Sequence, residues 1–260
     1  MFGHYLKNQK SKKTLVLIHG WCCNSGHFNK QVDALKSEFN IYCANYSEIV
    51  RTYDGTEDNI FFYCARKIQE EITRLELHNI FFIGHSMGGN IALMLANSLE
   101  NEAIGSVFID ATMPCSSQVI EKYNAFFLNL DETDFNHQEK MVREFIENKW
   151  NKEYDSNRLM QTIVDGMIST WRACPNQFNK LYRDALKFDS RDALEKLRGP
   201  LMYLAATPPA GNLMELAEIK KNIDIQKILS GHFIMLSQHS KANELLTNFL
   251  MQDSNLRHAN

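Results

Sequence analysis

The sequence predicts an α/β fold in which a mostly parallel central sheet is flanked by helices. Apolar runs such as residues 14–18 (TLVLI) and 79–83 (NIFFI) alternate with amphipathic stretches of helical periodicity. Uninterrupted apolar strands are typical of parallel sheets, because helices cover both faces of such a sheet. With 260 residues, the chain is long enough for one large domain of this kind.

Short apolar runs and longer periodic stretches define the expected elements in order. Strands are expected where apolar or β-branched residues are continuous, at 14–18, 41–44, 79–83, 106–109, 200–206 and 223–229. Helices are expected where apolar residues recur every three or four positions, at 32–39, 56–77, 90–99 and 240–250. The alternation of strands with helices is the pattern of parallel strands joined by crossover helices.

The strand pattern stops between residues 115 and 197. Segments such as QEKMVREFIENKW and SNRLMQTIVDGMISTW in this region are typical of amphipathic helices rich in Met, Phe and Trp. We therefore expect a helical insertion over 115–197 within a core made of residues 1–114 and 198–250. The last residues, 251–260, are expected to form a frayed tail.

Charge and cysteine content exclude several classes of protein. The chain has 28 basic and 31 acidic residues and a formal charge of −3, so nucleic acid is not an expected partner. Its first apolar run, at 15–18, is too short for a signal peptide or a membrane span, and a cytoplasmic location is expected. The six cysteines show neither CxxC pairs nor zinc-finger spacing, so free thiols and no metal are expected. Cys22 and Cys23 are expected to pack rather than to react.

The motif Gly84-x-Ser86-x-Gly88 lies between an expected strand and an expected helix, which is the context of a nucleophile elbow. Its two glycines permit a tight turn that exposes the serine. The start of the following helix supplies backbone N–H groups that stabilise a developing oxyanion. Ser86 is therefore the predicted nucleophile, and the alternative is a chance glycine-rich turn.

A nucleophilic serine needs a general base, which open α/β sheets supply from a late loop. His232 follows the expected strand 223–229 and precedes the closing helix, so it is expected at the carboxyl edge of the sheet. His239 and His258 are expected to be solvated, and His85 is expected to be part of the motif only. The alternative role for His232 is that of a loop histidine capping the last helix.

The segments LIHGW, GHSMGG and the late GHF, in this order around alternating strands and helices, resemble the α/β-hydrolase superfamily over nearly the whole chain. This resemblance implies an α/β-hydrolase fold with its cap at 115–197. It also implies an oxyanion hole formed by the backbone N–H groups of Trp21 and Met87. A serine at the elbow, instead of a carboxylate, favours acyl transfer to water.

The acid of the implied catalytic triad departs from the commonest pattern of the superfamily. Most members place it after the strand written PLMYLAA here, but the residues that follow are TPPAGN, with no Asp or Glu before Glu215. A minority take the acid from the strand after the nucleophile helix, where this chain has Asp110 in SVFIDATMP. Asp110 is therefore the predicted acid. The alternatives are Glu215, no acid at all, or a helix-capping role for Asp110.

The predicted activity is that of a carboxylesterase that needs no cofactor and acts on a small-molecule ester or acyl substrate. Cap side chains are expected first to pack and second to line a lipophilic pocket: Met141, Phe145, Trp150, Met160, Met167, Trp171 and Phe178.

Other functions stay open at this point. A methyl esterase acting on acyl carrier protein is one alternative, because basic cap residues such as Arg143 and Lys149 suit an acidic carrier. Interspersed glutamates favour an ordinary solvated helix face instead. A non-catalytic ligand receptor on the same fold is the second alternative. C–C bond hydrolysis, hydroxynitrile cleavage and perhydrolysis would use the same residues.

Overall fold

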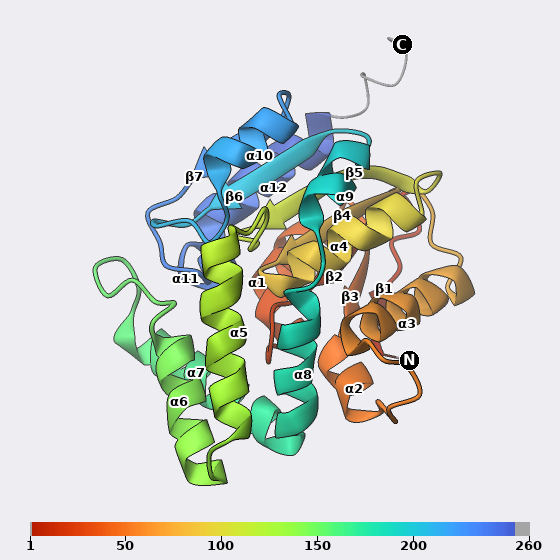
Figure 1. Ribbon diagram of the computed structural model, residues 1–260. Coiled ribbons are helices and arrows are strands. Elements are labelled where there is room, and N and C mark those ends of the chain that lie inside the picture. Colours follow the sequence, from red (N-terminus) through yellow and green to blue (C-terminus); the bar gives the residue numbers. More distant parts are fainter. Residues whose placement is uncertain (1, 253–260) are drawn as a thin grey trace.

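A seven-stranded sheet forms the centre of the protein, for which the computed structural model describes residues 2–252 (Figure 1). Its order is β1-β3-β2-β4-β5-β6-β7, and all neighbouring strands are parallel except β1 and β3. The strands are β1 (Gly3–Leu6), β2 (Thr14–Ile18), β3 (Asn40–Ala44), β4 (Ile80–His85), β5 (Ala103–Ile109), β6 (Leu201–Ala205) and β7 (Asp224–Lys227). Every residue of β2, β3, β4 and β6 is buried, as expected for strands covered on both faces. The predicted α/β class is confirmed.

Helices cover both faces of this sheet (Figure 1). On one face, α1 (Asn29–Leu35), α11 (Ile234–Ser237) and α12 (His239–Gln252) contact one another. On the other face, α4 (Met87–Ser98) contacts α3 (Ile60–Arg74). Three further short helices belong to this part: η1 (Ser25–Phe28), α2 (Tyr46–Arg51) and α10 (Leu213–Ile219). Among residues 2–252, no helix combines the length and the apolar character needed to cross a bilayer.

Between β5 and β6 the chain forms only helices: α5 (Ser117–Asp131), α6 (Phe135–Glu147), α7 (Asn157–Ala173), α8 (Pro175–Ala185) and α9 (Ser190–Lys196). Helices α5 to α8 pack beside one another at one end of the sheet, and we call them the cap bundle (Figure 1). Helix α9 instead contacts α4 and α10, so the end of this segment packs on the core.

Several elements differ from the sequence expectation. The strand β1 and the helix α2 are not predicted, because both are short and β1 alternates half-buried with exposed positions. Helix α3 begins later than the expected 56–77, since the Asn59 side chain caps it by accepting from the N–H groups of Phe61 and Phe62. Helix α12 runs to Gln252 and so includes the first two residues of the expected tail, while residues 253–260 lie outside the described residues.

Three buried histidines near the carboxyl ends of β2 and β4 have a lowered pKa. Burial lowers the pKa of His19 to about 3 and the pKa of His27 to about 4. Burial also lowers the pKa of His85 well below its ordinary value. All three rings are therefore neutral in the folded protein at neutral pH, whereas in the unfolded chain they bind protons below about pH 6.5.

We expect the free energy of unfolding to fall as the pH drops below about 6.5, because unfolding then lets these rings bind protons. Each histidine contributes a loss of about 2 kcal/mol between neutral pH and about pH 5. Urea unfolding at both pH values measures this loss of stability. In His27→Met the loss should be smaller by about 2 kcal/mol, the contribution of one histidine. Equal wild-type stability at the two pH values would contradict this expectation.

Candidate active site

Ser86 occupies the sharp turn between β4 and α4. Its φ of 53° and ψ of −125° lie in a region that residues other than glycine rarely adopt. A Cβ atom on Gly84 would come within 3.0 Å of the Gly88 backbone, and one on Gly88 would come equally close to the carbonyl oxygen of His19. The turn therefore needs both glycines, and it leaves the Ser86 side chain half-buried at the wall of a cavity.

The loop His19-Gly20-Trp21 follows β2 and lies against this turn. A Cβ atom on Gly20 would be 3.2 Å from the Cβ atom of Ser86. Among the described residues, no acceptor is found for the backbone N–H of Trp21 or for that of Met87, the first residue of α4. Both predicted oxyanion donors are thus free of protein partners on elements that adjoin Ser86.

Asp110 and His232 form a buried hydrogen-bonded pair. His232 Nδ1 lies 2.6 Å from Asp110 Oδ2, and the residues are 8% and 1% exposed. Asp110 Oδ1 accepts hydrogen bonds from the N–H groups of Ala206 and Ala210, at 3.1 and 3.0 Å. Because an ionised carboxylate only accepts, we assign the hydrogen of His232 to Nδ1, which leaves Nε2 as an acceptor. Ser116, not Asp110, caps the first helix of the cap bundle.

Ser86 and His232 line the same cavity, which has a volume of about 30 Å³. Apolar and aromatic side chains form most of its remaining wall, together with one lysine: Trp21, Phe145, Ile146, Lys149, Met167, Tyr182 and Phe233. The structure thus brings the predicted nucleophile, base, acid and oxyanion donors together at one edge of the sheet.

The other acid and base candidates lie elsewhere. Glu215, the alternative acid, is on α10 and pairs with Arg191. His239 is the first residue of α12, where its ring contacts the neighbouring Ser240 hydroxyl. His258 lies outside the described residues. None of the described alternatives contacts His232 or Asp110.

His85 has a contact that the sequence does not predict. Its Nε2 lies 2.9 Å from the backbone carbonyl oxygen of His232, and the two rings are 4.7 Å apart. Since a carbonyl oxygen accepts, Nε2 carries the hydrogen. Burial keeps the pKa of His85 low, so a neutral ring makes this bond. His85 is therefore more than a part of the motif, because it holds the backbone of the His232 loop.

A second group of contacts ties the His232 loop to the cap bundle. Asp155, in the link between α6 and α7, is buried and accepts hydrogen bonds from the N–H groups of Gly231 and Asn151, each at 3.0 Å. The N–H of His232 donates to the carbonyl oxygen of Lys149 at 2.9 Å. A Cβ atom on Gly231 would overlap Asp155, so the loop and the link fit together only with glycine there. No sequence motif relates Asp155 to the histidine, so this contact is not predicted from the sequence.

Aromatic contacts join the oxyanion loop to the cap bundle. Trp21 Nε1 donates to the carbonyl oxygen of Phe178 at 2.9 Å. The Trp21 ring also has edge-on contacts with three rings: Phe127, Phe145 and Tyr182. Of the cap residues singled out by the sequence, Phe145 and Met167 line the cavity at Ser86. The remaining ones do not line that cavity.

The cysteines are all free, and all except Cys115 are buried. Burial raises the pKa of the Cys22 and Cys23 thiols beside the oxyanion loop, which keeps them protonated. Because the thiolate is the reactive form, this environment favours packing over reaction. Within residues 2–252, no group of three or more His, Cys, Asp or Glu side chains has an arrangement suited to a metal ion.

The sequence is similar to those of known hydrolases. The model of the alpha/beta hydrolase family matches residues 15–244. The uncharacterized hydrolase YugF of Bacillus subtilis (strain 168) is 26% identical over 126 residues, which are 46% of this chain and 42% of that protein. A serine hydrolase-like protein of Danio rerio is 30% identical over 100 residues, which are 37% of this chain and 30% of that protein. The chain thus matches less than half the length of either relative.

Solved structures resemble this one over almost its full length. MenH from S. aureus has a TM-score of 0.80 at 15% identity, covering 98% of this chain and 99% of its own. An esterase (EaEST) from Exiguobacterium antarcticum has a TM-score of 0.74 at 20% identity, covering 96% and 94%. A thermophilic esterase from Thermogutta terrifontis has a TM-score of 0.78 at 16% identity, covering 96% and 93%. At these identities the likeness establishes the fold alone.

Gly88→Ala should destabilise the protein by about 3 kcal/mol, the upper end of the usual cost of overpacking, because the new methyl group would meet backbone oxygens that cannot move away. Gly166→Ala is the matched control: nothing lies within 4 Å of its Cβ position in α7, so a gain of about 0.5–1 kcal/mol is expected there. Urea unfolding of both variants tests this contrast, which equal stabilities would disprove.

Asp155→Ala should loosen the His232 loop, because the N–H groups of Gly231 and Asn151 lose their acceptor. We expect amide hydrogen exchange at Gly231 to accelerate by about tenfold or more, since each lost bond costs about 1–3 kcal/mol. Asp134→Ala is the control, because Asp134 also accepts from two N–H groups but lies at the start of α6. Unchanged exchange at Gly231 in Asp155→Ala would refute the role of this contact.

Proposed function

The chain belongs to the alpha/beta hydrolase family, and we propose that it is a serine hydrolase that cleaves carboxylic esters through an acyl-enzyme on Ser86. One observation carries the proposal: His232 Nδ1 is 2.6 Å from Asp110 Oδ2, while His232 and Ser86 share the wall of one cavity. A hydroxyl, an imidazole and a carboxylate arranged in this order can form a catalytic triad for acyl transfer.

In the proposed reaction, Ser86 Oγ attacks the ester carbonyl carbon while His232 Nε2 takes the serine proton. Asp110 keeps the hydrogen on Nδ1 and stabilises the imidazolium that forms. The tetrahedral intermediate then breaks its C–O bond to the alcohol, which leaves with the proton from Nε2. Water attacks the acyl-enzyme with His232 again as base, and the acid and free Ser86 are released.

The proposed oxyanion donors are the backbone N–H groups of Trp21 and Met87. The Met87 group opens α4, so the positive end of the helix dipole adds to its effect. One such donor typically lowers the barrier by about 3 kcal/mol, because it is already oriented before negative charge develops. The hydrogen bond from the Trp21 ring to the cap bundle fixes the position of Trp21 and so of its backbone N–H group.

Two observations support an ester as the substrate. The cavity at Ser86 is lined mainly by apolar and aromatic side chains such as Phe145 and Met167, which suit the apolar part of an ester. The similar structures include two esterases, from E. antarcticum and T. terrifontis.

The alternatives from the sequence have less support. Arg143, one of the basic residues suggested for a carrier protein, pairs with Asp165 at 2.8 Å, so the carrier substrate stays a prediction. The cytoplasmic location also stays a prediction. A non-catalytic receptor does not need a buried His–Asp pair beside a half-buried elbow serine, and ester turnover distinguishes it from an enzyme.

Hydrolysis of p-nitrophenyl esters from acetate to dodecanoate tests the proposal. Ser86→Ala should lose activity by about 10⁴-fold or more, because the nucleophile is removed. Asp110→Asn should lower kcat by about 10⁴-fold, because an amide favours the wrong histidine tautomer. Glu215→Gln is the matched control, and its activity should stay within about threefold of wild type, since Glu215 pairs only with groups away from His232.

A fluorophosphonate probe separates the remaining outcomes. Labelling of Ser86 without ester turnover would indicate a hydrolase with a narrow substrate. A protein that neither turns over esters nor is labelled at Ser86 would favour the receptor. Wild-type activity in Asp110→Asn would show that another group serves as the acid.

A further inference from the structure

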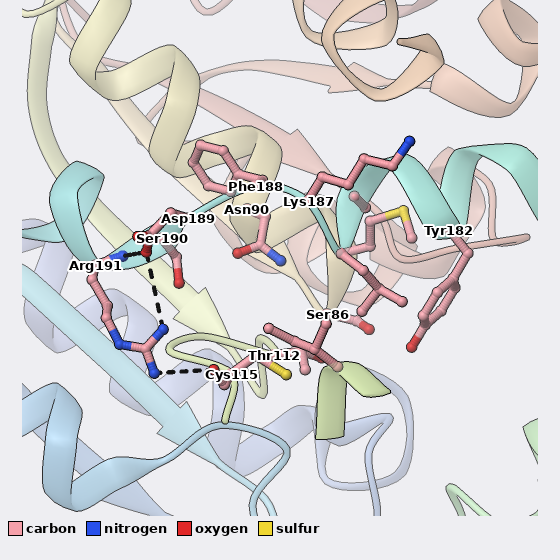
Figure 2. A pocket seen from close by; sticks show the side chains of 14 residues that line it. Ser86, Asn90, Thr112, Cys115, Tyr182, Lys187, Phe188, Asp189, Ser190 and Arg191 are labelled. Atoms are coloured by element: carbon pink, nitrogen blue, oxygen red, sulfur yellow. Dashed lines mark hydrogen bonds and ion pairs between the residues drawn. The ribbon is translucent and has the colours of Figure 1, made fainter. Parts of the chain in front are cut away.

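A cavity of about 220 Å³ lies beside Ser86 (Figure 2). Its walls come from the start of α4, the chain after β5, the start of α5, the end of α8 and the chain that leads into α9. Ser86 lines both this cavity and the smaller one that it shares with His232. A substrate held at Ser86 can therefore extend one arm into the larger cavity.

Asn90 lies on the wall of this cavity, four residues after Ser86 in the chain. The residue is only 8% exposed and its Oδ1 is completely buried, yet its side-chain amide has no hydrogen-bond partner among the described residues. Figure 2 shows this amide directed into the same space as the side chains of Ser86 and Thr112. A buried amide without a partner destabilises the protein, so a ligand that bonded to it would bind more tightly.

The charged side chains around the cavity already have partners. Lys187 pairs with Asp184 at 2.8 Å. Arg191 pairs with Glu215. Among the described side chains that line the cavity, Asn90 is the one with a completely buried polar atom that has no hydrogen-bond partner, and its amide group can donate as well as accept. A neutral polar group matches it better than an ion does.

We infer that this cavity binds a neutral, oxygen-bearing arm of the substrate, such as a ketone or a hydroxyl group, through the Asn90 amide. The inference rests on the proposed ester hydrolysis. Ser86 and Asn90 line the same cavity, so a substrate bound at Ser86 can bring this oxygen to the amide. An alkyl arm of the same shape would cover the amide without bonding to it, so the cavity selects against such an arm.

Two matched ester pairs test this inference, and each pair exchanges a carbonyl oxygen for a methyl group. The acyl pair is p-nitrophenyl 4-oxopentanoate and p-nitrophenyl 4-methylpentanoate. The alcohol pair is 3-oxobutyl acetate and 3-methylbutyl acetate. In at least one pair, the oxo-to-methyl ratio of kcat/KM should fall by about tenfold or more in Asn90→Leu relative to wild type.

Asn101→Leu is the control, because it makes the same chemical change at an exposed position just after α4. Its ratios should equal those of wild type in both pairs. Intrinsic differences in ester reactivity cancel, since the same two esters are compared between proteins. Ratios in Asn90→Leu that equal the wild-type ratios in both pairs would overturn the inference.

A binding measurement keeps this test separate from the proposed function. If no ester is hydrolysed, the proposed function fails, and the cavity is then examined in the Ser86→Ala protein. The side-chain NH₂ signals of Asn90 in ¹H–¹⁵N spectra should shift on addition of methyl 4-oxopentanoate or 3-oxobutyl acetate. They should shift less with the methyl analogues. Equal responses to the oxo and methyl compounds would overturn the inference independently of turnover.

Discussion

The hydrogen bond between Asp110 and His232 is the interaction on which the candidate site depends. It joins the end of β5 to the loop after β7, two parts of the chain that are separated in sequence by the cap segment, β6 and β7. Both partners are buried, so removal of either would leave a polar or charged group without compensation in a poorly solvated place. The loop after β6, which has no acid of its own, donates two N–H groups to the Asp110 carboxylate. This loop, which has no Asp or Glu of its own, thus supports the proposed acid on the neighbouring strand.

The histidine loop is also held from two other directions. His85, at the end of β4, donates to the carbonyl oxygen of His232. The link between α6 and α7 holds the loop through Asp155 and the carbonyl oxygen of Lys149. Because this link belongs to the segment that forms the cap bundle, the position of the proposed base depends on how the bundle sits on the core. The Trp21 contact with Phe178 gives the oxyanion loop the same dependence.

Two spaces of different character meet at Ser86. The smaller one is lined mainly by apolar and aromatic side chains, whereas the larger one contains the unpartnered amide of Asn90. An apolar cavity discriminates between ligands mainly by their shape. A buried polar group disfavours any ligand that cannot form a hydrogen bond with it. If the proposed ester hydrolysis holds, discrimination between esters depends more on the cavity with the polar amide than on the aromatic cavity.

The sequence by itself determines the elbow, because glycine spacing between an apolar strand and an apolar helix is a local property of the chain. The order of elements likewise places Ser86, Asp110 and His232 at one edge of a parallel sheet. Short elements such as β1 are missed, since a half-exposed edge strand has no continuous apolar run. Only the tertiary structure decides which distant groups meet: Gly231 and Asp155 are 76 residues apart, and the amide of Asn90 is left without a partner by packing alone. Contacts of this kind depend on how the cap segment and the loops pack on the sheet, and the local periodicity of the sequence does not determine this packing.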